Sequence, residues 1–331
     1  MRLIAADKTT LALPESKALW KRFGAHSGQQ GLGPISAELC CLFDIISRAP
    51  IRFVYDKVCT SEHKLINRLI KYIKKGDMVL MDSGFYYAVT FNKILLRCAH
   101  FLIPAKKNIR PKVLRNLGEG DYLCQIKDYD SNTDINVRVV FVYRKGFRRR
   151  RLITSLLDPI LYPASELANL YHMRWDIETF YRDFKHTLSA TSWHCRTQDS
   201  FHQELLMHMI SSCLIRIAMV HAGKLVNLYV GQLSFARALT ETRLFLKILV
   251  SNPDLLSWHS TWKGLIHRCS KHRVRVEPGR QFSRNRQEYR RKSRGLKIKS
   301  RGRKPKYAGE PLIARDRETL KDRKGNVFLL S

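Results

Sequence analysis

The most informative segment of the sequence covers residues 171–188 and reads YHMRWDIETFYRDFKHTL. Polar and aromatic side chains recur in it at helical spacing: Tyr171, Arg174, Glu178, Tyr181 and Lys185. At about 100° per residue, these five fall within an arc of roughly 80° on one helix face. The adjoining arc is apolar and consists of Leu170, Ile177, Phe180, Phe184 and Leu188. The pattern predicts a long helix over residues 165–188, with a polar stripe at the edge of the core.

The composition of the whole chain favours a polyanionic partner. Lys and Arg number 60 against 28 Asp and Glu, which gives a formal net charge of +32 over 331 residues. Such an excess indicates nucleic acid or, as the weaker alternative, an acidic membrane surface. We expect no membrane association, because no apolar run approaches the roughly 20 residues that span a bilayer. The N-terminus does not resemble a signal peptide, so a cytoplasmic location is predicted.

The N-terminal third of the chain alternates between predicted strands and helices. Strands are predicted at 2–6, 39–46, 51–58, 78–81 and 99–105, and a helix at 62–74. The first strand ends on Asp7, and the short apolar run Met78–Met81 ends on Asp82. Strands that alternate with a helix in this way predict an α/β sheet flanked by helices.

The composition changes twice along the rest of the chain. Residues 108–157 are predicted to form a β-rich insertion that ends in the basic cluster Arg144–Arg151. Two further helices are expected within 199–222 and 233–250, and residues 267–307 are dense in Lys and Arg. This basic tail is expected to be extended or partly disordered unless it is bound. We predict four regions along the chain: the first part of an α/β core (1–107), the insertion (108–157), the second part of the same core (158–250) and a basic C-terminal region (251–331).

Three carboxylates are candidates for one site. Asp7 and Asp82 each follow a predicted strand, and open α/β sheets place ligands at strand ends. Glu178 lies on the polar helix stripe, where an ordinary i, i+4 ion pair with Arg174 is the alternative interpretation. Three converging carboxylates repel one another unless a cation lies between them. Such an oxygen-only site suits Mg²⁺ or Mn²⁺, and two ions about 4 Å apart serve phosphoryl transfer.

The pattern Y-x2-R-x3-E-x6-K, formed by Tyr171, Arg174, Glu178 and Lys185, resembles the signature helix of the insertion sequence 4 family of transposases. Residues 7–10 (DKTT) and 76–85 (GDMVLMDSGF) resemble the segments that carry the first and second aspartates in that family. The likeness extends over roughly residues 1–300. The helix motif and both aspartate motifs occur in the family's order, which makes the combination more specific than any one motif.

The resemblance implies a ribonuclease-H-like mixed sheet flanked by helices and interrupted by the β-rich insertion. It implies that Asp7, Asp82 and Glu178 are the catalytic and metal-binding triad, and that the metal is Mg²⁺ or Mn²⁺, as two ions. Tyr171, Arg174 and Lys185 would contact DNA. The expected activity is cut-and-paste transposition: cleavage of double-stranded DNA at the transposon ends and transfer into a target, by a homodimer on DNA. The implied location is the nucleoid of a bacterial cytoplasm.

The sequence departs from the family's pattern at three places. Lys8 stands where the family has Gly, and Ser83 stands where it has Arg. The third departure is the short segment before Asp7, which leads us to expect a chain without the family's N-terminal end-recognition domain. One alternative is therefore a truncated, non-catalytic DNA-binding remnant or inhibitor of a longer relative. A nuclease of related fold that acts on structured RNA is a further alternative, although this helix signature would be unexpected in it.

Overall fold

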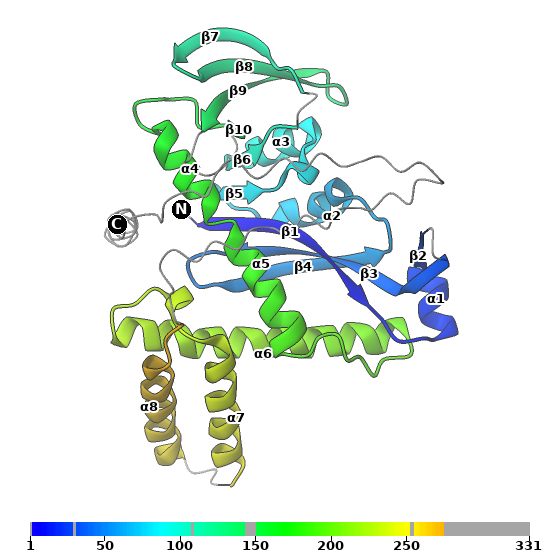
Figure 1. Ribbon diagram of the computed structural model, residues 1–331, viewed down its shortest axis with the longest axis vertical. Coiled ribbons are helices and arrows are strands. Elements are labelled where there is room, and N and C mark those ends of the chain that lie inside the picture. Colours follow the sequence, from blue (N-terminus) through cyan, green and yellow to red (C-terminus); the bar gives the residue numbers. More distant parts are fainter. Residues whose placement is uncertain (1, 29–30, 107–108, 143–149, 252–254, 275–331) are drawn as a thin grey trace, which may run out of the picture. The chain divides into compact units, whose positions relative to one another are not determined.

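The computed structural model describes residues 2–28, 31–106, 109–142, 150–251 and 255–274 (Figure 1). The predicted basic cluster Arg144–Arg151 therefore lies outside the described residues except for its last two members. The predicted basic tail also lies outside them from residue 275 onward. Residues 267–271, which we expected to begin that tail, belong instead to the last described helix.

One mixed sheet organises the described part of the chain. Its first strands are β1 (Leu3–Ala12), β2 (Ala25–Gly28), β3 (Gly31–Asp44) and β4 (Ala49–Lys57), followed by β5 (Met78–Met81) and β6 (His100–Pro104). β1 pairs antiparallel with β3, which pairs antiparallel with β2 and β4. On its other side β1 pairs in parallel with β5, and β5 pairs in parallel with β6. The predicted α/β class with a mixed, ribonuclease-H-like sheet is confirmed.

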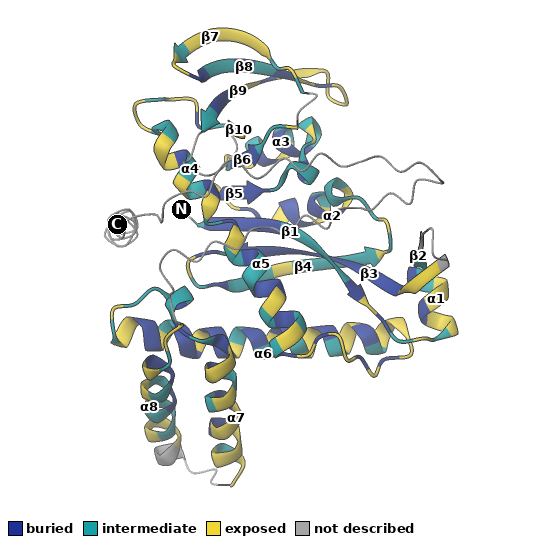
Figure 2. Ribbon diagram, in the orientation of Figure 1, coloured by how far each residue is buried: buried dark blue, intermediate teal, exposed yellow. Residues whose placement is uncertain are grey.

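The strands of the predicted insertion continue this same sheet. β10 (Arg150–Thr154) pairs antiparallel with β6, and β9 (Thr133–Val142), β8 (Asp121–Asp128) and β7 (Lys112–Gly118) follow in order. Figure 2 shows that burial decreases along this series, from the buried central strands to the largely exposed β7. The segment thus adds strands to one edge of the sheet within the described residues.

Helices cover both faces of the sheet. One face packs against α1 (Lys17–Phe23) and against α4 (Ala164–His172), α5 (Trp175–Arg182), η3 (Asp183–Thr187) and α6 (Gln198–Leu225). The opposite face packs against α2 (Glu62–Leu69), η1 (Ile70–Tyr72), η2 (Ser83–Phe85) and α3 (Ala88–Leu95). Side chains of β1 alternate between the two cores, because successive residues of a strand point to opposite faces. Leu3 and Ala5 enter the first core, and Ile4 and Ala6 enter the second.

The predicted single helix over 165–188 is interrupted twice. Between α4 and α5, the amides of Arg174 and Ile177 bond carbonyls three residues earlier, which tightens the chain at the signature arginine. From Asp183 to Thr187 the helix widens into a π-turn, closed by a hydrogen bond from the Leu188 amide to the Asp183 carbonyl (2.9 Å). The apolar stripe is buried as predicted, because Ile177, Phe180 and Phe184 all lie in the first core.

The last described helices form a hairpin that projects from α6 (Figure 1). The short η4 (Val230–Gln232) leads from α6 into α7 (Phe235–Ser251), and α8 (Leu255–Lys271) returns beside it. By length and apolar composition alone, α6 could cross a membrane, which corrects our expectation that no run is apolar enough. This is weak evidence for a span, because a core helix passes the same test and α6 contributes ten buried residues to the fold.

Candidate active site

Asp7 and Asp82 lie side by side, Asp7 on β1 and Asp82 directly after the end of the adjacent strand β5. In the parallel pairing of β1 with β5, Ala6 is opposite Met81, and each aspartate is the next residue along the chain. The alternation of the strands directs both side chains to the face that packs against α5. Asp82 follows β5 as the N-cap of η2, where its Oδ1 accepts a hydrogen bond from the Gly84 amide (2.8 Å). Sequence motifs that are far apart in the chain thus meet at one point of the sheet.

The prediction that the first strand ends at Asp7 is wrong. β1 continues to Ala12, because β3 supplies antiparallel partners from Asp7, opposite Cys41, as far as Ala12, opposite Ser36. Only the parallel partner β5 ends at Met81. Asp7 is therefore paired with β3 on one side and lies next to the end of β5 on the other. The pairing with β3 fixes the backbone of Asp7 more firmly than it would be fixed at the end of a strand.

Arg174 connects the third carboxylate to the first. Its guanidinium donates to the Glu178 Oε1 at 2.6 Å and lies 3.8 Å from the Asp7 Oδ2. The arginine side chain is 9% exposed, whereas the Glu178 side chain is 37% exposed. The ordinary i, i+4 ion pair between Arg174 and Glu178 is therefore present. The same guanidinium also lies near the Asp7 carboxylate, so it links the two acidic residues. The structure thus brings Asp7 close to Asp82 and connects Asp7 to Glu178 through Arg174.

Burial dominates the electrostatics of Asp7. Desolvation disfavours the charged carboxylate and raises its pKa to about 7. Arg174 and the Lys8 amide oppose this rise, while the nearby charges of Asp82 and Glu178 add to it. The site therefore holds more negative charge than its one arginine neutralises, which is a situation that a bound cation relieves.

The raised pKa of Asp7 predicts a pH-dependent loss of stability in metal-free protein. Between about pH 4 and pH 7 the folded state keeps a proton that the unfolded chain has released, so this group lowers stability as pH rises. The slope approaches roughly 1.4 kcal/mol per pH unit for one group. Asp7→Asn removes the effect, so the variant should gain stability over wild type as pH increases across this window. Urea denaturation at several pH values in a chelator measures the difference.

The control for this experiment is Asp134→Asn, which changes an exposed aspartate on β9. Its stability curve should run parallel to that of wild type over the same pH range. A constant difference between Asp7→Asn and wild type from pH 4 to pH 8 would contradict the assignment of the effect to Asp7.

The remaining residues of the polar helix stripe lie near the same point. The Tyr181 hydroxyl donates to the Asp7 carbonyl (2.7 Å), and the Lys185 Nζ donates to the Thr10 carbonyl (2.8 Å), so both hold α5 and η3 against β1. Partial burial lowers the pKa of Lys185. Tyr171 is buried, and the Arg174 guanidinium lies 5.9 Å from the centre of its ring.

Sequence reasoning missed a second set of charges beside the aspartates. Glu38 is buried on β3, accepts from the Thr10 hydroxyl and lies 3.5 Å from the Lys8 Nζ. Glu62, at the start of α2, packs so closely on Gly84 that a Cβ there would lie 1.7 Å from its Oε2. A side chain at position 84 would therefore displace this carboxylate from its present position. The second aspartate motif contains Asp82 and Gly84, which could have drawn attention to this part of the chain. Nothing in the sequence indicated that Glu62 would lie beside them.

The donor chemistry of the site fits a hard divalent cation. Asp7, Asp82 and Glu178 offer only oxygen ligands, which Mg²⁺ and Mn²⁺ prefer. Among the residues that the structure describes, no three His, Cys, Asp or Glu side chains are close enough together to hold an ion. Arg174 takes the position of positive charge between Asp7 and Glu178 instead. For these three residues to bind one metal ion, the Glu178 carboxylate would have to leave its ion pair with Arg174 and bind the ion.

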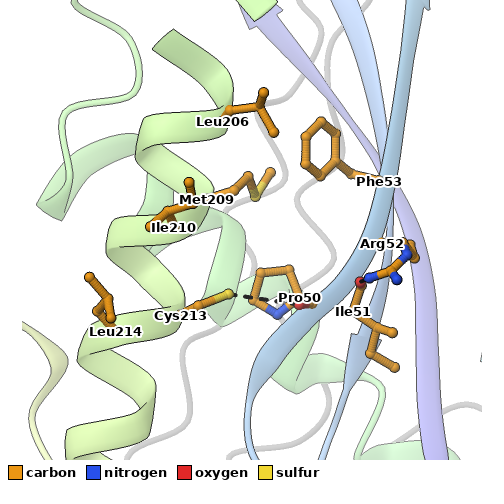
Figure 3. A pocket seen from close by; sticks show the side chains of 9 residues that line it. All are labelled: Pro50, Ile51, Arg52, Phe53, Leu206, Met209, Ile210, Cys213 and Leu214. Atoms are coloured by element: carbon orange, nitrogen blue, oxygen red, sulfur yellow. Dashed lines mark hydrogen bonds between the residues drawn. The ribbon is translucent and has the colours of Figure 1, made fainter. Parts of the chain in front are cut away.

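The apolar hollows of the surface lie elsewhere. One, of about 230 Å³, lies between β4 and α6, where Pro50 and Phe53 face Met209 and Cys213 (Figure 3). A second, of about 330 Å³, adjoins it and is bordered by Arg216. Neither is lined by a carboxylate or by any residue of the signature motif. The candidate site is thus separate from these two hollows, and its Asp7 and Arg174 side chains are mostly buried between β1 and α5.

Comparison with known proteins gives a consistent set of relatives. Residues 1–214 match the family model described as "Transposase DDE domain". The "Transposase InsG for insertion sequence element IS4" of Escherichia coli (strain K12) is 28% identical over 238 residues, which cover 68% of this chain and 53% of that protein. The "Probable transposase for insertion sequence element IS5377" of Geobacillus stearothermophilus is 22% identical over 246 residues, 71% of this chain and 61% of that protein.

The chain thus spans between half and two thirds of the length of these two curated relatives. Among solved structures, the piggyBac transposase synaptic complex with hairpin DNA overlaps 85% of this chain and 59% of that chain, with a TM-score of 0.45 and 10% identity.

Proposed function

This chain belongs to the DDE transposases of the insertion sequence 4 family, and from that membership we propose that it cleaves DNA at the ends of an insertion sequence and joins the ends to a target. The catalytic residues in this proposal are Asp7, Asp82 and Glu178. The observation that carries it is the register of β1 and β5, which places Asp7 and Asp82 side by side on the face that packs against the signature helix.

The three carboxylates would hold Mg²⁺ or Mn²⁺. When bound, a pair of such ions activates an attacking oxygen and stabilises the leaving oxygen of a phosphodiester. In the first step, water attacks the phosphodiester at the element's end, and the bond to the 3′ oxygen breaks to leave a 3′-hydroxyl. In the second, that hydroxyl attacks a phosphodiester of the target DNA, so that a new phosphodiester forms while the bond to the target's own 3′ oxygen breaks and that oxygen leaves as a 3′-hydroxyl. The residues of the chain position the phosphate and carry its charge during both steps.

The basic signature residues have complementary roles in this proposal. Arg174 lies between Asp7 and Glu178, so release from Glu178 frees a guanidinium that can contact a phosphate through two hydrogen bonds. Lys185 would act as a point charge on the backbone beside the scissile bond. Tyr171, in contact with Arg174, would hydrogen-bond a phosphate or stack on a displaced base.

The test is cleavage by the full chain of a labelled duplex that carries the terminal repeat of its own element. We expect nicking in Mg²⁺ or Mn²⁺ and none in a chelator. Since the chain covers only part of the length of its relatives, the assay is run with and without the polypeptide encoded immediately upstream. Metal-independent nicking would contradict the proposed chemistry. Tight DNA binding without cleavage in both conditions would favour the alternative, a DNA-binding remnant that inhibits a longer transposase.

DNA is the proposed partner, and bringing two ends together requires at least two copies of the chain. The large positive charge supports binding to the phosphate backbone in a bacterial cytoplasm. In this proposal the residues after Val274 contribute a sequence-independent share of the affinity, since the stretch up to residue 307 is dense in Lys and Arg.

Truncation after Val274 should therefore weaken binding to all duplexes and flatten its dependence on salt. Each lost phosphate contact reduces the log–log slope by about 0.9, because fewer counterions are released. Fluorescence anisotropy of one labelled duplex, titrated with full and truncated chains between about 50 and 200 mM salt, gives both slopes. Equal slopes for the two chains would exclude a role for the basic tail in backbone contacts.

A further inference from the structure

Two aspartates flank Glu178 on the same helical segment. Asp176 and Asp183 are seven residues apart, close to two helical turns, so they share one side of α5. Glu178 follows Asp176 by two residues and is therefore rotated by about 200° around the helix. The proposed metal ligand thus points away from both aspartates.

Asp183 is held by an arginine from α6. Its Oδ2 accepts from the Arg216 guanidinium at 2.7 Å, and the Arg216 side chain is 2% exposed. The other side of the guanidinium lies 4.2 Å from the centre of the Phe235 ring at the start of α7. The pair therefore ties the end of α5 to the beginning of the α7–α8 hairpin.

Asp176 is held by a second arginine and a tyrosine. The Tyr229 hydroxyl donates to its Oδ2 (2.7 Å), and an Arg48 nitrogen lies 3.7 Å from its Oδ1. Arg48 is almost fully buried in the turn between β3 and β4 and has a φ of 56°, a left-handed backbone conformation uncommon outside glycine. Gly231 leaves room for its guanidinium, because a Cβ there would lie 2.2 Å from an Arg48 nitrogen.

Stability alone does not account for this arrangement. The Nε atoms of Arg48 and Arg216 are buried and have no hydrogen-bond partner among the described residues. Replacing a buried ion pair with apolar side chains is often neutral or stabilising, because desolvation offsets the attraction. Two such ion pairs on one side of a short helix fix its orientation, because they oppose rotation of the helix about its own axis. The π-turn, which begins at Asp183, would otherwise leave the end of α5 free to rotate.

We propose that Arg48 and Arg216 are positioning residues for Glu178, which they orient toward Asp7 by holding Asp176 and Asp183 from the opposite side of α5. The inference rests on the proposed function for the role of Glu178 as a metal ligand. It assigns a task to four charged residues that have no contact with the substrate or the metal in the proposed mechanism. It also implies that the base of the α7–α8 hairpin and the catalytic helix move as one body.

The test compares Arg216→Met and Arg48→Met with wild type in the full chain without DNA. Binding of Mn²⁺, followed by the electron paramagnetic resonance signal of the free ion, should weaken by about 10- to 100-fold in both variants, as for other residues that orient metal ligands. Hydrogen exchange of the amides of residues 175–182 should become faster. Arg216→Lys, which retains a charge for Asp183, should recover most of the Mn²⁺ affinity.

The matched control is Arg268→Met, which breaks an ion pair with Glu241 between α8 and α7 and leaves α5 untouched. It should change neither Mn²⁺ binding nor exchange in α5. Unchanged exchange in α5 for both arginine variants, or a loss of stability with unchanged Mn²⁺ affinity, overturns the inference. If wild type binds no Mn²⁺ while exchange in α5 still rises in the variants, the positioning of α5 is supported and the proposed metal site is the part that fails.

Discussion

Glu178→Gln should abolish strand cleavage while leaving DNA affinity close to that of wild type. The substitution keeps the size of the side chain and its ability to accept from Arg174, but it removes the charge that the proposed metal site needs. Loss of one ligand or charge-stabilising group at a transition state typically costs about 10²- to 10³-fold in rate, and often more when the site is lost altogether. In the proposed function, DNA binding depends mainly on Lys and Arg side chains that the substitution does not alter.

The measurement pairs metal-dependent nicking of a labelled terminal repeat with a gel-shift titration of the same duplex. Glu166→Gln is the matched control, because Glu166 is an exposed glutamate in the first turn of α4 and has no contact with the aspartates. Lys185→Ala should lower both the rate of cleavage and the affinity for the cut DNA end. Retention of cleavage by Glu178→Gln would remove Glu178 from the proposed catalytic triad.

Arg138→Met should cause the largest loss of stability of any single substitution considered for this fold. Arg138 is fully buried on β9 and donates to both carboxylate oxygens of Asp121, at 2.8 Å for the Nε contact. It also donates to the carbonyls of Asp158 and Tyr162, which lead into α4. Removing the arginine leaves a buried aspartate without its partner, which costs about 3–5 kcal/mol in comparable pairs.

The free energy of unfolding from guanidinium denaturation measures this effect. Arg22→Met is the control, since Arg22 forms an ion pair with Asp56 at the surface and should cost less than about 1 kcal/mol. The double variant Arg138→Met with Asp121→Leu should recover much of the loss, because it removes the unpaired charge as well. A loss equal to that of Arg22→Met would show that water or another group replaces the buried partner.

The sequence predicted the parts of the site that depend on local pattern. Apolar runs located β5, and an apolar stripe located the buried side of α5, because burial imposes a period on the sequence. Asp82 could be placed at the end of its strand for the same reason. The proximity of Asp7 and Asp82 was then expected from the general position of ligand sites in such sheets. The register of β1 with β5 places Asp7 beside the end of β5, which Asp82 directly follows.

What could not be predicted depends on tertiary contacts. The continuation of β1 beyond Asp7 results from pairing with β3, and residues 8–10 carry no apolar signal for it. Extending the 3.6-residue period through 171–188 fails at Asp183, where the π-turn shifts Lys185 relative to Glu178. Nothing in the sequence indicated that Arg48 and Arg216, from distant segments, are partners of Asp176 and Asp183.

The central position of β1 also determines the order in which a nascent chain can assemble. β1 lies between β3 and β5, and its aspartate meets Arg174 only after the chain has been made through residue 174. Contacts this distant in sequence slow folding, because a long loop must close before they form. Until then Asp7 and Asp82 are two neighbouring acidic groups without a counter-charge from α5. A synthesis intermediate that ends before residue 174 should therefore remain loosely packed around them and be a favoured substrate for proteases and chaperones.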